Sequence, residues 1–226
     1  LNTPFIKGKG SFGHVFSTDE KAAASRYTEC MFTDIAKECF RGMNGIEMIP
    51  SYDNKLKEPL LLPVSYPSIL CNTSQGIAVG ISTNIPSFNF HEVNKATIEY
   101  IKTGEIKKAL APDFTTGGSY ILNEHELKKL MTTGNAKIKL RGKWHIEGKI
   151  IVIDEIPYYT TVEEIKNAVK DLPGVNDVKD ECDRNGLRVT IECASKKLVD
   201  SVVNEVLRVS NLQMQITSNI VVIIDN

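Results

Sequence analysis

The 226-residue sequence lacks long hydrophobic runs, and its longest apolar stretches, such as residues 220–224, are only a handful of residues long. A helix that spans a bilayer needs about 20 apolar residues. The sequence therefore predicts neither a transmembrane segment nor a secretory signal peptide. Cysteine is also scarce, because the chain has five cysteines with no C-x-x-C pair and no histidine spacing typical of a zinc site. We expect reduced thiols in a cytoplasmic protein with no membrane partner and no metal site of its own.

The sequence also lacks a strong excess of either charge, because 27 Lys and Arg stand against 28 Asp and Glu. Whole-chain charge therefore gives no indication of nucleic-acid binding. Positive charge is instead concentrated in residues 111–150, which hold seven basic and four acidic side chains. With 42% hydrophobic and 24% charged residues, the chain has the composition of a soluble globular protein rather than of a disordered or fibrous one.

Local patterns predict several helices in the first part of the chain. A helix is expected over residues 19–43, because three successive alanines are strong helix formers and apolar residues recur at every fourth position from Tyr27 to Cys39. Residues 46–88 contain five prolines, which predict an irregular connector with short strands at 60–62 and 77–81. Helices are expected again over 89–103 and from Asn123 to Gly134.

The second half alternates between strand and helix patterns. Basic residues at 137, 139, 141 and 143 alternate with Ile138 and Leu140, and a strand over 144–155 follows, which predicts a hairpin with one basic face. Helices are expected over 161–172 and 195–209, with strands at 175–181 and 187–193 across a turn at 183–186. The order predicts an α+β fold with more than one folding unit and helices on one face of a largely antiparallel sheet.

A glycine-rich stretch near the start, GKGSFGHV at residues 8–15, fits the phosphate-covering loop of protein kinases. A kinase also needs a lysine on the following strand, an H-R-D segment and a D-F-G, and the sequence has none of these. The dinucleotide-binding interpretation fails because no strand precedes the loop and no crossover unit follows it. The glycine motif alone is therefore a weak signal.

Five blocks, in order along nearly the whole chain, carry a more specific resemblance. They are GKGSFG (8–13) with AAASRYTE (22–29), LPVSYP (62–67), SQGIAVGISTNIP (74–86), PDFTTGG (112–118) and DECDRNGLR (180–188). Together they resemble the A subunits of the bacterial type IIA DNA topoisomerases, DNA gyrase and topoisomerase IV. The motifs do not separate the gyrase form from the topoisomerase IV form. One departure is the segment after residues 156–158, where Tyr159 and its neighbours lack a lysine common in the family.

The resemblance implies that Tyr27 is the nucleophile that attacks a DNA phosphodiester and becomes linked to the 5' end. It also implies that Arg26 contacts the phosphate, for which a forked guanidinium is well suited. Because one phosphodiester replaces another, the broken strand can be resealed without an external energy source at that step. From the helix pattern alone, Tyr27 would be interpreted as a core residue of the apolar stripe, so its catalytic role depends on the resemblance.

The same resemblance assigns DNA contacts elsewhere. Ile77 matches an apolar wedge that enters between base pairs and helps to bend the duplex, although without the resemblance it would be interpreted as a buried strand residue. The basic residues of the predicted hairpin are a candidate track for DNA phosphates, with a solvated face as the equal alternative. These residues are Lys137, Lys139, Arg141 and Lys143.

The resemblance further implies an excised piece of a longer polypeptide. Residues 1–50 are expected to be the end of a winged-helix domain, and 51–226 a tower domain that begins with the connector at 51–88. The parent would be a nucleoid-associated, ATP-dependent enzyme that passes one duplex through a break in another. Its expected partners are double-stranded DNA, a second copy of the same polypeptide in a homodimer, and a B subunit that supplies Mg²⁺ and ATP. We expect the fragment alone to be inactive. The alternative is an architectural module that bends DNA without covalent chemistry.

Overall fold

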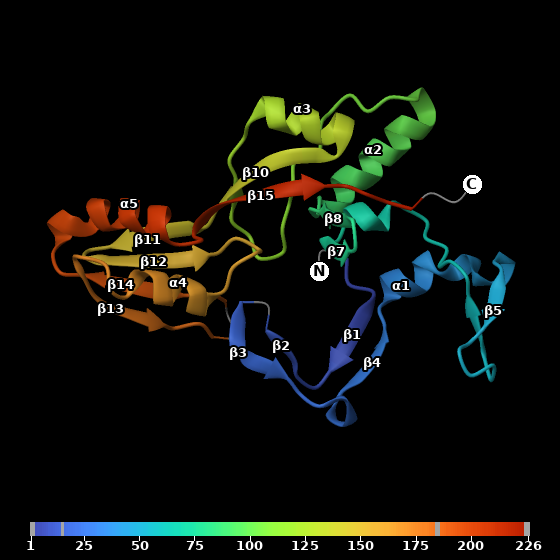
Figure 1. Ribbon diagram of the computed structural model, residues 1–226, viewed down its shortest axis with the longest axis horizontal. Helices are drawn as coiled ribbons and strands as arrows, with labels where there is room; N and C mark the ends of the chain where they lie inside the picture. The colour runs from blue at the N-terminus through green and yellow to red at the C-terminus, as the bar shows by residue number, and fades with distance from the viewer. Residues whose placement is uncertain (1–2, 15, 184–185, 224–226) are drawn as a thin grey trace.

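The computed structural model describes residues 3–14, 16–183 and 186–223, and it is a mixed α/β structure in which all the described strand pairings are antiparallel (Figure 1). The first part of the chain consists of short elements. These are β1 (Ile6–Lys9), β2 (Phe12–His14), β3 (Ser17–Ala22), the 3₁₀ helix η1 (Ser25–Tyr27), β4 (Glu29–Phe32), α1 (Asp34–Cys39), η2 (Arg41–Gly45), β5 (Met48–Pro50), β6 (Lys57–Pro59) and η3 (Ser68–Leu70).

A five-stranded sheet with strand order β7-β8-β15-β10-β9 forms the centre of the molecule. Its strands are β7 (Ser74–Ala78), β8 (Ile81–Ile85), β9 (Ser119–Tyr120), β10 (Asn135–Arg141) and β15 (Gln213–Asn219). Two helices, α2 (Phe90–Thr103) and α3 (Glu124–Thr133), share its core, in which Val93 and Leu130 pack with Ile138. Because side chains alternate along β10, Lys137 and Lys139 lie on the face away from this core.

A second, four-stranded sheet has the order β11-β12-β14-β13. Its strands are β11 (Lys143–Glu147), β12 (Ile150–Glu155), β13 (Val175–Asp180) and β14 (Val189–Cys193). Helices α4 (Val162–Val169) and α5 (Val199–Val209), the latter preceded by η4 (Lys196–Leu198), share one core with it, in which Ile165 and Val202 pack with Ile153 and Ile191. The predicted antiparallel pairing with helices on one face is therefore confirmed, with two sheets in place of one.

The helix ends are set by local capping, which explains why three helices were predicted close to their observed bounds. Asn89 caps the start of α2, and Gly104 ends it with φ +76°. Asn123 and Gly134 do the same for α3, although the Glu126 carboxylate accepts a hydrogen bond from the Lys137 amide instead of completing a capping box. These signals lie within a few residues of each end and need no tertiary context.

The predicted helix over residues 19–43 is wrong, because this stretch forms β3, η1, β4 and α1. β4 pairs with β1, from a segment more than twenty positions earlier, in a register that sets Gly8 opposite Cys30. Tyr27 and Met31 are exposed, whereas Cys39 is buried, so the fourfold apolar spacing does not mark one helix face. Long-range strand pairing has overridden the helix propensity of the alanines.

The predicted basic hairpin is also wrong, because β10 pairs with β15 and β9 while β11 pairs with β12. The chain leaves the first sheet and enters the second at Gly142, which is buried. A Cβ at Gly142 would overlap the Glu155 carbonyl oxygen and a Leu212 methyl carbon. Only glycine fits this crossing point, so the strand pattern that runs through residues 137–147 belongs to two different sheets.

Two smaller differences concern the connector. Residues 60–62 form no strand, whereas residues 77–81 include the turn of the β7–β8 hairpin rather than one strand. The early segment also packs on the central sheet, since Cys39 belongs to the same core cluster as Ile138 and Leu140 of β10. Within the described ranges, no helix combines the length and apolarity needed to cross a bilayer.

Candidate DNA-cleavage and DNA-contact residues

Tyr27 lies at the end of η1, in the loop between β3 and β4. Its side chain is 68% exposed, so the core interpretation from the helix pattern is excluded. The loop is held by its backbone, because the Tyr27 amide donates to the Ala24 carbonyl (2.8 Å) and the Thr28 amide donates to the Ser25 carbonyl (3.2 Å). The phenol therefore faces solvent from a loop with a defined backbone.

Gly10 supports the same loop from the neighbouring turn between β1 and β2. It has φ +95°, and a Cβ at this position would lie 2.8 Å from the Tyr27 carbonyl oxygen. Both features require glycine. The glycine-rich stretch that resembles a kinase loop is thus used for close packing against the tyrosine loop.

Arg26 and Tyr27 are brought together by the structure. The Arg26 guanidinium carbon lies 4.8 Å from the centroid of the Tyr27 ring, which is the geometry of a cation–π contact. The Arg26 side chain is exposed, so its forked N–H groups are open to a ligand. A phosphate oxygen near the phenol would lie within reach of this cation.

Ile77 lies near the tip of the β7–β8 hairpin and is 93% exposed, so the buried-strand interpretation is excluded as well. Val79 and Gly80 form the two-residue turn, in which Gly80 has φ +79°. Val79 is fully exposed and Ile81 is half exposed. The tip is therefore an apolar projection. The sequence analysis did not identify Val79 as a candidate DNA-contact residue, and its only signal in the sequence was its position two residues after Ile77.

The four candidate basic residues do not form one surface. Lys137 and Lys139 are exposed on β10, opposite Thr217 and Gln215 of β15. Arg141, on the same strand, is half-buried and donates from Nε to Gln213 Oε1 (2.7 Å). Lys143 lies on β11 in the other sheet, with its Nζ 2.9 Å from Glu155 Oε1. Only the first two remain as an open pair of cations on one strand face.

The tyrosine loop and the apolar hairpin belong to separate regions. In Figure 1, η1 and β4 lie at the lower edge of the molecule, the β7–β8 hairpin lies near the centre and β10 lies above it. The candidate residues thus form three sites along one chain: the Arg26–Tyr27 loop, the Ile77 tip and the β10 lysines. A ligand that contacts all three must be extended.

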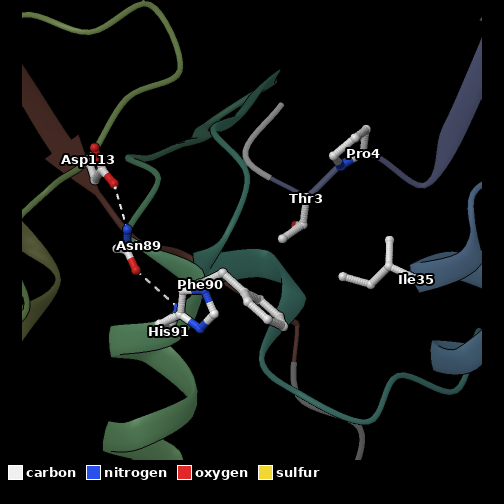
Figure 2. Close-up of a pocket in the computed structure, with 7 residues that line it drawn as sticks. All are labelled: Thr3, Pro4, Ile35, Asn89, Phe90, His91 and Asp113. Atoms are coloured by element: carbon white, nitrogen blue, oxygen red, sulfur yellow. Dashed lines mark hydrogen bonds between the residues drawn. The ribbon is translucent and has the colours of Figure 1, made fainter.

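A cavity of about 340 Å³ lies between the N-terminal segment, α1 and the start of α2 (Figure 2). It is lined by Thr3, Pro4, Ile35, Asn89, Phe90, His91 and Asp113. Asn89 donates from Nδ2 to Asp113 Oδ2 (3.1 Å) and accepts from the His91 amide (3.0 Å), so its polar groups serve the helix cap. This cavity contains none of the candidate residues, and we assign it no ligand.

The described residues also offer no group of three or more His, Cys, Asp or Glu side chains arranged to hold a metal ion.

Comparison with known proteins identifies the family. The family model that describes the A subunit of DNA gyrase/topoisomerase IV matches residues 1–226. The chain belongs to this family, and the assignment made from the five sequence blocks is confirmed.

Curated relatives agree with this assignment. The chain is similar over its full length to the DNA gyrase A subunits of Campylobacter fetus (34% identical), Clostridium acetobutylicum (37%) and, as the chloroplastic/mitochondrial form, Nicotiana benthamiana (35%). It spans only 28%, 29% and 26% of the length of these relatives, respectively.

Proposed function

We propose that this chain is part of the DNA breakage-reunion subunit of a type IIA topoisomerase and that Tyr27 becomes covalently linked to DNA. The observation that carries the proposal is the exposed Tyr27 phenol beside the Arg26 guanidinium, in a chain of the A-subunit family of DNA gyrase and topoisomerase IV. An exposed, firmly held phenol with an adjacent cation suits attack on an anionic phosphodiester.

The reaction is a transesterification. The Tyr27 oxygen attacks phosphorus, the new bond to phosphorus forms as the bond to the 3' oxygen breaks, and the phenol proton is lost while the 3' oxygen gains one. Arg26 holds the phosphate and offsets the charge that develops on its oxygens. Resealing is the reverse step, in which the 3' hydroxyl attacks the phosphotyrosine.

The other two sites bind and bend the duplex. Ile77 at the hairpin tip enters a base step, which costs a few kcal/mol of stacking that contacts along the bent duplex offset. Lys137 and Lys139 contact phosphates independently of the base sequence. Arg141 and Lys143 contribute less to phosphate binding, because they already donate hydrogen bonds to Gln213 and Glu155, respectively.

Residues 1–50 are the end of a winged-helix domain and 51–226 a tower domain, with 51–88 as its connector. The full-length polypeptide forms a homodimer on double-stranded DNA in the nucleoid of the cytoplasm. The B subunit supplies the ATPase and the Mg²⁺, so the fragment alone does not cleave DNA and the assembled enzyme passes one duplex through another.

The rival function is an architectural module that bends DNA while Tyr27 never reacts. The exposed apolar hairpin tip is equally consistent with this alternative and with the enzyme.

The experiment that separates the two functions uses the full-length chain with its partner subunit, supercoiled DNA and Mg²⁺, followed by a detergent quench and mass spectrometry of DNA-linked peptides. A nucleotide adduct on Tyr27, lost in Tyr27→Phe with DNA binding retained, supports the enzyme. No adduct and no relaxation by the wild type, with DNA bending retained in Tyr27→Phe, supports the architectural module.

A further inference from the structure

We propose that residues 159–163, the end of the β12–α4 connection and the first residues of α4, position the Ile77 hairpin and the Tyr27 loop relative to each other and so couple DNA bending to DNA cleavage. The segment contacts the hairpin at one end and the strand that leads to the tyrosine at the other. This inference rests on the proposed function, because it concerns how the bending and cleaving sites act together.

The first contact is with the base of the hairpin. The Tyr159 hydroxyl donates to Asn84 Oδ1 (3.0 Å), and Gln75 Nε2 donates to the same oxygen (3.3 Å). Gln75 and Asn84 face each other across β7 and β8, and Asn84 Nδ2 donates to the Thr217 carbonyl of β15 (2.8 Å). Tyr159 therefore ties both strands of the hairpin to the β12–α4 segment.

Burial supports the direction of this hydrogen bond. It raises the pKa of Tyr159 to about 12, so the phenol remains a protonated donor over the physiological range. Tyr159 also packs edge-on against Tyr158 and Phe114, with ring centroids 5.2 and 6.0 Å away. Its hydroxyl is thus held in place by its own ring contacts as well as by Asn84.

The second contact is with the β2–β3 hairpin. The Val162 amide donates to the Phe16 carbonyl (2.9 Å), and the Ser17 hydroxyl donates to the Glu163 carboxylate. Ser17 is the first residue of β3, and β3 leads directly into η1, which carries Tyr27. In Figure 1, β3 begins near α4 and runs downward away from it, while the loop after β12 projects toward the centre of the molecule.

The segment between the two contacts is rigid. Thr160 is buried and donates to Glu164 Oε2 (2.8 Å), and Thr161 forms a capping box with Glu164 at the start of α4. Val162 belongs to the core of the four-stranded sheet. A close-packed segment transmits a displacement instead of absorbing it, so movement of the hairpin on DNA shifts the strand that leads to Tyr27.

The test uses the full-length chain with its partner subunit. Two quantities are measured, the bent fraction of a dye-labelled duplex and the yield of covalent complex. Tyr159→Phe removes only the hydroxyl contact and is expected to lower both quantities about 2- to 10-fold. A duplex with a mismatch at the wedge step bends more easily and should restore both. If the flexible duplex restores bending and covalent yield, Tyr159→Phe has misplaced the hairpin. A general loss of structure would not be restored by a change in the DNA.

At the other end, Ser17→Ala is expected to lower the covalent yield by a similar factor while the bent fraction is unchanged, with no rescue by the mismatch. Glu163→Gln keeps the side-chain volume and an oxygen that can accept from Ser17, so it should lose less covalent yield than Ser17→Ala. The controls are Tyr120→Phe in β9 and Ser51→Ala, since Ser51 makes the same kind of contact, with Asp53 (2.8 Å), on a distant turn. Both controls should behave as wild type.

The double variant Tyr159→Phe/Ser17→Ala tests whether the two contacts act through the same segment. If the segment couples the sites, the double variant loses less covalent yield than the product of the single losses. The inference would be overturned if the loss of covalent yield in the double variant equalled the product of the two single losses. It would also be overturned if the single variants gave the same covalent yield as wild type. Tyr27→Phe in the same assay must lose the covalent complex; if it does not, the proposed function fails instead.

Discussion

The Arg26 guanidinium lies over the ring of Tyr27, with its carbon 4.8 Å from the ring centroid. Two residues adjacent in sequence usually point apart on an extended strand, but the 3₁₀ turn of η1 brings these two side chains together. The pair thereby presents a nucleophile and a cation to the same volume of solvent. The proposed chemistry depends on this pairing.

Arg26 should be sensitive to the shape of its cation as well as to its charge. Arg26→Ala removes charge-assisted hydrogen bonds to the phosphate and should slow covalent-complex formation about 10- to 100-fold. Arg26→Lys should fall between Ala and wild type, because a single ammonium lacks the guanidinium fork. Quenched time courses measure the rate, with Arg208→Lys on α5 as the control. Equal rates for Arg26→Lys and wild type would contradict the assigned role.

Gly10→Ala should impair cleavage through the backbone. The added methyl would lie 2.8 Å from the Tyr27 carbonyl oxygen at a position with φ +95°, so the tyrosine loop must move. Gly148→Ala is the matched control, since Gly148 has φ +67° with no atom within 4 Å of the added Cβ. Both should lose about 1 kcal/mol or more of stability from the backbone strain, but only Gly10→Ala should lower the covalent yield at equal DNA binding. An equal loss in both would assign the effect to stability alone.

Ile77→Ala should separate bending from folding. The side chain is 93% exposed, so its removal should change the free energy of unfolding by less than about 0.5 kcal/mol. The bent fraction of a dye-labelled duplex should fall, because alanine is too short to wedge a base step. Ile98→Ala on α2, also exposed, is the control. A large fall in melting temperature with unchanged bending would show that Ile77 is structural.

The β10 lysines should account for part of the salt dependence of DNA binding. Each phosphate contact contributes about 0.9 to the slope of log affinity against log salt. Lys137→Gln/Lys139→Gln should therefore reduce the slope by about 2 in a titration of binding against salt. Lys143→Gln should change it less, because Glu155 already pairs with Lys143. A slope unchanged in the double variant would leave these lysines as a solvated face.

Stability should depend on pH through His145 on β11. Hydrogen bonds to Asp154 (2.8 Å) and Glu147 (2.9 Å) raise the pKa of His145 above its ordinary value of 6.5. The stabilisation is fully present below about pH 6.5, the unfolded-state pKa, and is lost as the pH rises through the higher folded-state pKa. Melting temperature of the fragment against pH should therefore fall less steeply for His145→Gln than for wild type. His91→Gln is the control, and parallel curves for His145→Gln and wild type would refute the prediction.

Helix caps and the family blocks could be recognised from the sequence because their signals are local. Asn89, Asn123 and Thr161 accept hydrogen bonds from amides two or three residues ahead, so a short window of sequence contains the whole interaction. The same holds for the ordered blocks that assign the chain to its family. Arg26 and Tyr27 likewise lie within a local motif that the sequence shows without any geometry.

Partners far apart in the chain could not be predicted in this way. Nothing near residues 19–43 indicates that β4 pairs with β1, and nothing near Gly142 indicates that Leu212 and Glu155 close around it. Strand pairing and sheet membership are set by backbone hydrogen bonds between distant segments, which outweigh local propensity. By itself, the sequence determined the family, the ends of the three capped helices α2, α3 and α4, and the candidate tyrosine. Only the tertiary structure decided that Tyr27 and Ile77 are exposed and that the basic residues are divided between two sheets. It also placed Tyr159 against Asn84 in the Ile77 hairpin and Glu163 against Ser17 at the start of β3, because exposure and contact depend on which distant segments pack together.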